Sequence, residues 1–150
     1  MSEVIVFSWD HAGYLLAEPL IELAREMGYT TVSLGKYNTE PVDYPECVAS
    51  VVSTMRAGKG QRGVLICGSG IGMSMAANRY KDIRAAVCTS ECEARTARAH
   101  NNANILCLGA RVIGESQAKS CLQVFLTTPF AGGRHQRRVE MIDTLAEQGC

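Results

Sequence analysis

The sequence has no surplus of charge of either sign, since fifteen Lys and Arg residues balance fifteen Asp and Glu residues among 150. This balance argues against nucleic acid or another polyelectrolyte as the partner. Long apolar runs are also missing, which argues against a membrane span. The start of the chain shows no basic segment followed by an apolar block, as a secretory signal would. We therefore expect a cytoplasmic protein without nucleic-acid or membrane partners.

Internal repeats, linkers and low-complexity tracts are absent too, so we expect a single domain over residues 1–150. A hydrophobic content of 47% suffices for a core without covalent staples. No matching His or Cys pair accompanies Cys88 and Cys92, whose spacing alone would suit a metal, so we expect no metal site. The cysteines form an odd, scattered set typical of reduced thiols: Cys47, Cys67, Cys88, Cys92, Cys107, Cys121 and Cys150.

What the sequence does contain is an alternation of short apolar runs with segments of helical spacing. Strands are predicted over 4–8, 29–34, 63–67, 84–88 and 103–108, with a polar loop over 37–45. Helices are predicted over 14–27, 46–57, 72–80, 91–101 and 114–127, and from 133 onward. This alternation predicts an α/β fold: a Rossmann-like three-layer α-β-α domain with a five-stranded parallel sheet.

The most informative motif follows the third predicted strand. Cys67 ends that strand, and Gly68, Gly70 and Gly72 come after it, with Ser69 between the first two. Ligands of open α/β sheets bind at the carboxyl ends of strands, and glycines let backbone N–H groups approach them. The alternative is that Cys67 is a small buried hydrophobe. The position at the strand end favours a reaction site.

A nucleotide phosphate is the second interpretation of these glycines. The loop lacks the Lys-Ser/Thr pair of a P-loop. Its glycines are also too closely spaced for the dinucleotide fingerprint, and they follow the third strand instead of the first. We therefore rank nucleotide binding behind a reaction site.

Other polar residues follow the remaining strands and should gather along the same edge of the sheet. These are Asp10, His11, Ser90 and Arg111. Asp10 and His11 together can supply a base and a cation, since imidazole titrates near neutral pH. The alternative is a solvent-facing turn in which Asp10 caps the next helix.

Basic residues lie at the ends of two of the later predicted helices. His100 ends one of them, where a histidine often serves only as a favourable partner of the helix dipole. Arg134 and Arg138 lie on one helix face beside His135 and would suit a phosphate dianion. The alternative is a solvated basic end of a helix. The sequence lacks a basic stripe with interleaved aromatic residues, which would indicate nucleic-acid binding.

Together these residues resemble the ribose-5-phosphate isomerase B family, which also includes galactose-6-phosphate isomerase subunits. The resemblance spans nearly the whole chain. It is carried by residues 10–13, 43–45, 66–74, 76–78, 83–85, 100–101, 104, 109–112 and 132–139.

The resemblance implies the Rossmann-like fold, no metal ion and no organic cofactor. It also implies a homodimer or homotetramer with shared active sites, and a C-terminal helix used in dimerisation. The reaction it implies interconverts ribose 5-phosphate and ribulose 5-phosphate through an enediolate. Alternatives are a hexose or tetrose phosphate, such as allose 6-phosphate or galactose 6-phosphate, or a non-catalytic phosphosugar-binding subunit.

Residue roles are carried over by the same resemblance. Cys67 matches the base that moves the proton, while Met73 stands where a second branch of the family has a glutamate. Ser69 and the amides of Gly68, Gly70 and Gly72 match the anion hole for the enediolate oxygen. His100, with Asp10 helping, matches the group that opens the furanose ring. The substrate-binding matches are His11, Arg111, Arg134 and Arg138 for phosphate, and Asn101 and Tyr44 for the sugar.

Two departures from the family pattern stand out. Ser69 replaces the threonine of many relatives and keeps the hydroxyl. Trp9 precedes Asp10 where relatives commonly have a smaller residue, so we expect it either to narrow the site or to pack at an interface.

Overall fold

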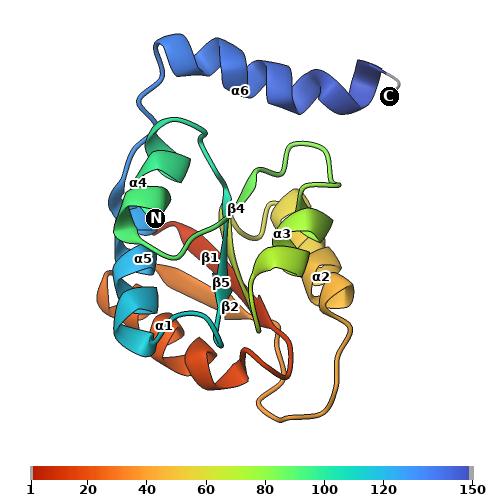
Figure 1. Ribbon diagram of the computed structural model, residues 1–150, viewed down its shortest axis with the longest axis vertical. Coiled ribbons are helices and arrows are strands. Elements are labelled where there is room, and N and C mark those ends of the chain that lie inside the picture. Colours follow the sequence, from red (N-terminus) through yellow and green to blue (C-terminus); the bar gives the residue numbers. More distant parts are fainter. Residues whose placement is uncertain (1, 149–150) are drawn as a thin grey trace.

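The computed structural model describes residues 2–148 and contains one parallel sheet of five strands. The strands follow the order β2-β1-β3-β5-β4 across the sheet (Figure 1). Their bounds are β1 (Val4–Trp9), β2 (Thr30–Ser33), β3 (Arg62–Cys67), β4 (Ala85–Val87) and β5 (Ile105–Gly109). The predicted α/β fold with a five-stranded parallel sheet is thus confirmed.

Helices cover both faces of the sheet, as the three-layer prediction requires. Helices α1, α4 and α5 lie on one face, and α2 and α3 on the other (Figure 1). Their bounds are α1 (Tyr14–Glu26), α2 (Tyr44–Arg56), α3 (Ile71–Ala77), α4 (Glu91–Ala99) and α5 (Glu115–Thr127). The chain continues in α6 (Arg134–Thr144) and the 3₁₀ helix η1 (Leu145–Gln148).

Most element boundaries differ from the prediction by only a few residues. The largest correction at a helix start is α2, which begins at Tyr44 because Pro45 fits the first turn, where its missing N–H costs nothing. The predicted loop therefore ends at Asp43. Helix α3 ends at Ala77 and not at Tyr80, and β4 keeps only three residues.

Two apolar layers hold the sheet between the helices. Side chains of β1 alternate, so that Ile5, Phe7 and Trp9 face one layer while Val6 faces the other. All four are at most 1% exposed. Side chains of β3 and β5 also alternate between the two layers, so the sheet is packed against helices on both faces. Loops at the strand ends consequently project from a rigid frame.

The centre of the sheet is a switch point. The chain runs from β1 to β2 on one side and then crosses back to β3 on the other side of β1. In the β1–β3 ladder, Trp9 lies opposite Ile66. The segment that starts at Asp10 therefore emerges next to Cys67. Cys67 in turn lies opposite Gly109 of β5, which places Arg111 just beyond. Such crevices at the carboxyl ends of strands are where open α/β sheets bind ligands.

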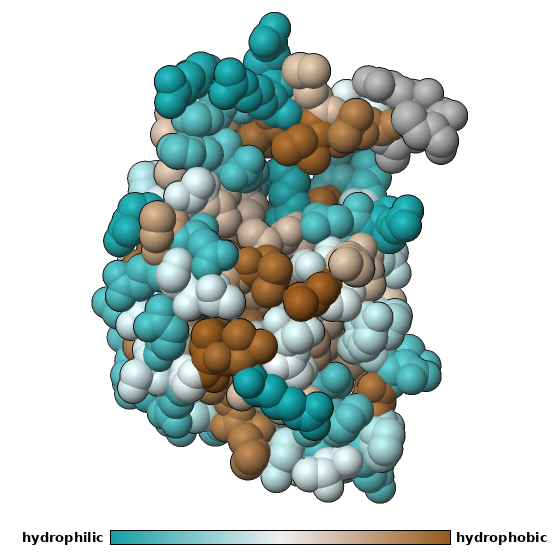
Figure 2. Space-filling view, viewed as in Figure 1, coloured by the Kyte–Doolittle hydropathy of each residue, from teal (hydrophilic) through white to brown (hydrophobic). Residues whose placement is uncertain are grey.

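Helix α6 lies across the opposite end of the molecule, apart from both helical layers (Figure 1). The space-filling view shows apolar side chains along this helix beside a hollow that separates it from the rest of the chain (Figure 2). A cavity of about 280 Å³ there is lined by Ile142 of α6 and by Ala85, Ala97 and Asn101. Asp143 ties the helix to Arg84, with Nη1–Oδ1 at 2.9 Å. No helix among residues 2–148 is long and apolar enough to cross a membrane.

Candidate active site

Cys67 ends β3 and its sulfur lies inside the turn that follows. The N–H of Gly70 donates to Sγ at 3.1 Å. The side chain is 5% exposed and packs in the apolar layer on the α2 and α3 side. The thiol is thus close to an amide donor and nearly shielded from water.

The glycines of the loop are required by close contacts. Gly70 has φ +79°, a left-handed conformation that favours glycine. A Cβ at Gly72 would lie 2.6 Å from Cζ of Tyr44, so the phenol ring rests directly against the loop. Ser69 Oγ accepts the N–H of Ile71 at 3.2 Å, which leaves its own O–H proton available. The loop therefore brings Ser69 and Tyr44 to the side of Cys67.

Asp10 is 7% exposed, so it does not face solvent, although it does lie in a turn before α1 as the alternative expected. Its Oδ1 accepts the N–H groups of Ala12 at 2.9 Å and Gly13 at 3.1 Å. These bonds shape the turn that carries His11. Asp10 therefore holds this turn, and its assistance in ring opening stays a prediction.

His11 and Arg111 share a cavity beside this turn. The cavity has a volume of about 540 Å³ and is also lined by Tyr14, Thr39 and Glu115. Arg111 is close to the glycine loop, since a Cβ at Gly68 would lie 3.5 Å from its Nη1. A cation and an imidazole thus border one opening beside the loop that holds Cys67.

Ser90 follows β4 at this edge, as predicted, and there it caps α4. Its Oγ accepts the N–H of Glu93 at 3.2 Å, while the Glu93 carboxylate accepts from Ser90 and Thr89. These donors hold the pKa of Glu93 below its ordinary value, Thr89 first. Ser90 is therefore explained by helix capping.

The other predicted residues lie together at the opposite end of the molecule. His100 is the C-terminal cap of α4, and its ring stacks on His135 with centroids 4.2 Å apart. Arg134 and Arg138 are exposed in the first turns of α6. Partial desolvation, followed by the electrostatic influence of the nearby His100, Arg134 and Arg138, holds the pKa of His135 below its ordinary value.

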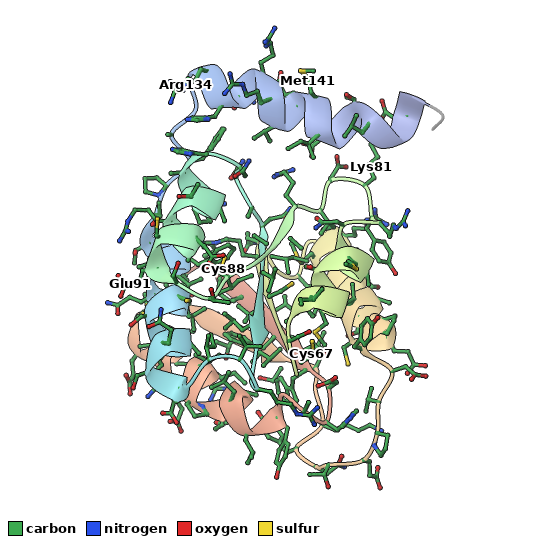
Figure 3. All side chains as sticks on the ribbon, in the orientation of Figure 1. Cys67, Lys81, Cys88, Glu91, Arg134 and Met141 are labelled. Atoms are coloured by element: carbon green, nitrogen blue, oxygen red, sulfur yellow. The ribbon has the colours of Figure 1, made fainter. Side chains whose placement is uncertain are left out.

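The predicted residues therefore form two groups, which we call the carboxyl-edge group and the α6-edge group. Strand β5 separates them, and its five residues span about 13 Å. Figure 3 shows Cys67 and Arg134 far apart along the long axis of the molecule. The carboxyl-edge group is Asp10, His11, Tyr44, Cys67, Gly68, Ser69, Gly70, Gly72 and Arg111. The α6-edge group is His100, Asn101, Arg134 and Arg138. A single chain does not bring the two together.

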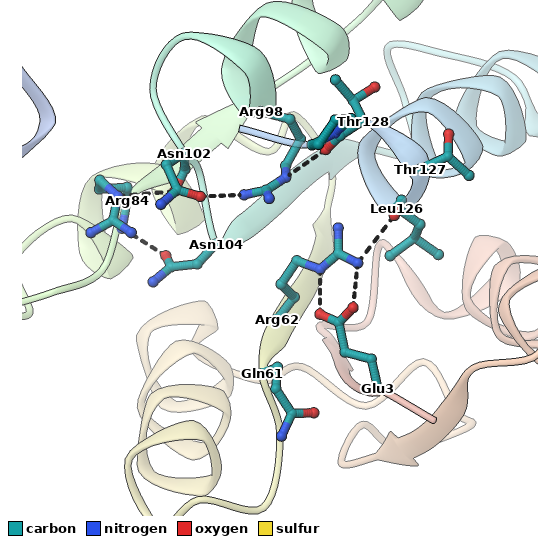
Figure 4. A pocket seen from close by; sticks show the side chains of 11 residues that line it. Glu3, Gln61, Arg62, Arg84, Arg98, Asn102, Asn104, Leu126, Thr127 and Thr128 are labelled. Atoms are coloured by element: carbon teal, nitrogen blue, oxygen red, sulfur yellow. Dashed lines mark hydrogen bonds and ion pairs between the residues drawn. The ribbon is translucent and has the colours of Figure 1, made fainter. Parts of the chain in front are cut away.

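Another cavity, of about 480 Å³, lies at the amino ends of the strands and is rich in arginine (Figure 4). Arg62 makes two 2.6 Å bonds to Glu3 and also donates to the carbonyls of Phe125 and Leu126. Arg98 donates to the carbonyls of Ala103 and Thr128. These bonds fasten the end of α5 to the sheet, so we assign the cavity a structural role.

The cysteines other than Cys67 show no comparable setting. Burial raises the pKa of Cys88 to about 12, whereas Cys92 is exposed. Among residues 2–148, no group of three or more His, Cys, Asp or Glu side chains is placed to hold a metal ion. Cys150 lies outside the described residues.

Sequence reasoning missed the part that the 34–43 segment has in the site. Val42 donates its N–H to Nδ1 of His11 at 3.3 Å, and Thr39 lines the cavity of His11. Trp9, for which two roles were considered, is buried within its own chain and donates to the carbonyl of Lys36 at 2.8 Å. Backbone donors and acceptors leave no side-chain signal in a sequence.

Several known proteins are similar to this chain over nearly its whole length. Residues 5–142 match the model of a family described as ribose/galactose isomerase. Ribose-5-phosphate isomerase B of Escherichia coli is 37% identical over 96% of this chain and 97% of its own length. The crystal structure of a ribose 5-phosphate isomerase from Thermotoga maritima has a TM-score of 0.92 at 43% identity, covering 97% of this chain and all of that one. The type B enzyme of Trypanosoma cruzi has a TM-score of 0.95 at 37% identity, with both chains fully covered.

Proposed function

This chain belongs to the ribose/galactose isomerase family and is an aldose–ketose isomerase, and we propose that it interconverts ribose 5-phosphate and ribulose 5-phosphate. The observation that carries the proposal is the Cys67 thiol, which accepts an amide N–H beside a cavity with His11 and Arg111. A proton-accepting group next to an anion-binding opening is what this reaction needs.

Cys67 is the proton-shuttling base in this proposal. As thiolate it removes the proton from C2 of the open-chain aldose, and the electron pair moves through C1 onto O1 to give an enediolate. A proton then passes from O2 to O1, and the proton held by the thiol is returned to C1. O2 becomes the ketone oxygen, and the thiolate is restored. Because Cys67 is nearly shielded from water, nearby hydrogen-bond donors stabilise negative charge at the reaction centre more strongly than they would in solvent.

The oxyanion is stabilised by the loop, with a division of labour among its donors. The Gly70 amide is already engaged with Sγ of Cys67, so it stabilises the base rather than the substrate oxygen. The Ser69 hydroxyl keeps its proton and can donate to the enediolate. Binding of phosphate by His11 and Arg111 then orients the reacting carbons at a distance.

Ring opening and the remaining phosphate contacts require the α6-edge group, which belongs in this proposal to a second copy of the chain. His100 transfers the proton that opens the furanose ring, and Arg134 and Arg138 complete the phosphate clamp. Asn101 contacts sugar hydroxyls. A two-fold dimer places one copy's α6 edge against the other copy's carboxyl edge and so forms two sites.

Exposed apolar side chains at both edges support this assembly. Met141 and Ile142 on α6 and Leu145 at the start of η1 are between 44% and 57% exposed. At the carboxyl edge, Leu15, Ile71 and Val112 are between 51% and 75% exposed. Apolar patches at two separate places favour contact between copies. The C-terminal helix is accordingly proposed as a dimerisation element.

A substrate panel tests the proposed function. The purified protein is assayed on ribose 5-phosphate, allose 6-phosphate and galactose 6-phosphate, with and without prior thiol alkylation. We expect the highest kcat/KM on ribose 5-phosphate and loss of turnover after alkylation. A higher value on a hexose phosphate would change the substrate, and no turnover on any of the three would contradict the isomerase.

A further inference from the structure

Trp9 is the single tryptophan of the chain and the last residue of β1, two residues before His11. Its ring is 1% exposed, and its Nε1–H donates to the carbonyl oxygen of Lys36 at 2.8 Å. Any large apolar side chain could fill this core position, but an indole also supplies a hydrogen-bond donor there. The bond to Lys36 is thus a specific link between the sheet and the following loop.

That loop, residues 35–42, is called the strap below. It has no helix or strand of its own, and its start is fitted to the indole. A Cβ at Gly35 would lie 2.3 Å from Cδ2 of Trp9, so the backbone at Gly35 rests on the ring. The ring of Tyr37 lies 5.0 Å from that of Trp9. One side chain therefore holds three consecutive residues of the strap.

The end of the strap reaches the proposed phosphate site. Val42 donates its N–H to Nδ1 of His11 at 3.3 Å, and Thr39 lines the cavity that His11 shares with Arg111. A neutral imidazole that accepts at Nδ1 carries its proton on Nε2. The strap thus selects the tautomer in which Nε2–H remains as the donor for a ligand.

We propose that Trp9 is a positioning residue, which holds the strap so that Val42 fixes His11 as an Nε2–H donor toward the substrate phosphate. The inference rests on the proposed function for the part that concerns substrate. It concerns binding and not the proton transfer, because neither Trp9 nor the strap contacts Cys67 through the bonds described. The proposal thereby assigns the indole N–H a role beyond core packing.

The first test is Trp9→Phe, which keeps an aromatic ring and removes the N–H. Loss of this bond should raise KM for ribose 5-phosphate about three- to tenfold, with kcat within about twofold of the parent. The matched control is Tyr29→Phe, which removes another bond from an aromatic side chain to a backbone carbonyl, the 2.9 Å bond to Leu126, outside the strap and the His11 cavity. We expect its KM to stay within about twofold of the parent.

Imidazole nitrogen NMR at pH 8.5 supplies a readout that needs no substrate, with His11 assigned by comparison with His11→Asn. The parent should show His11 in one tautomer, with the proton on Nε2, and Trp9→Phe should show a mixture. Inorganic phosphate, titrated while the His11 signals are followed, should bind more weakly to the variant. A role in core packing alone would lower the melting temperature without changing this tautomer.

Gly35→Ala tests the same link from the other side should Trp9→Phe fail to fold. The new methyl group must push the strap off the indole, which exposes Trp9 and shifts its fluorescence to longer wavelength. We expect the same rise in KM and the same mixture of tautomers. Unchanged KM and an unchanged His11 tautomer in a folded variant would overturn the inference. An inactive parent would instead refute the proposed function, while the tautomer measurement would still decide the role of Trp9.

Discussion

At the carboxyl edge the functional groups are fixed by backbone, whereas at the α6 edge they are exposed side chains. Cys67 and Asp10 are buried and bonded to amides of their own turns. Arg134 and Arg138 lie exposed on a helix that stands apart from the sheet and is tied to it by Arg84 and Asp143. In the proposed function, the rigid edge carries the proton transfer, while the outer helix supplies groups that recognise the substrate held by a neighbouring copy.

Removal of the thiol should have the largest effect. Cys67→Ala is expected to lower kcat by a factor of roughly 10² to 10⁴, because it removes the proposed base. Binding of a phosphorylated sugar acid, measured by calorimetry, should remain nearly intact, since phosphate contacts are untouched. Cys92→Ala, at an exposed cysteine on α4, serves as the control and should keep full turnover. Equal turnover in Cys67→Ala would refute the assignment of the base.

Removal of a cationic side chain from the α6 edge should weaken substrate binding. Arg134→Ala is expected to raise KM by roughly 10- to 100-fold with a smaller change in kcat, since a charge-assisted phosphate contact is lost. Arg95→Ala removes the same charge from an exposed position on α4 and should leave KM unchanged. Equal KM values in both variants would mean that Arg134 is only part of a solvated helix end.

Substitutions on the apolar side of α6 should act through assembly. The pair Met141→Asp and Ile142→Asp places two charges where both side chains are now exposed and apolar. We expect sedimentation to show dissociation to monomers, with activity lost in proportion, while the melting curve still shows a folded chain. A fully assembled and active variant would contradict the use of α6 in dimerisation.

The smallest effect concerns the cysteines of the α4 and α5 layer. Burial raises the pKa of Cys88 to about 12 and that of Cys121 to about 11, from an unfolded value of 9.0. The unfolded chain therefore loses these protons first, so this contribution to stability is full below pH 9 and falls as the pH rises toward 12. The melting temperature should decline over that range, and less steeply in Cys88→Ala. Equal slopes would contradict the burial argument.

The sequence allowed the succession of strands and helices to be predicted because each apolar period is local. It also allowed the reaction edge to be predicted, since Cys67 and Asp10 both follow buried strands. The order β5-β4 could not be predicted, because it depends on which strands pair. That copies share their active sites was implied by the resemblance alone. Helix α2 begins at Tyr44 and not at residue 46, because its first turn accommodates Pro45, which the pattern assigns to the loop. The bond of Val42 to His11 uses a backbone N–H and left no trace in the pattern of residues.

Subunit complementation tests most directly whether one site needs both edges. Cys67→Ala and His100→Ala, each nearly inactive alone, are unfolded together, refolded as an equal mixture and assayed. If a site joins Cys67 of one copy to His100 of the other, random pairing restores one of two sites in half of the dimers, or about one quarter of the parent activity. If both residues served a site within one chain, the mixture would be no more active than the separate variants.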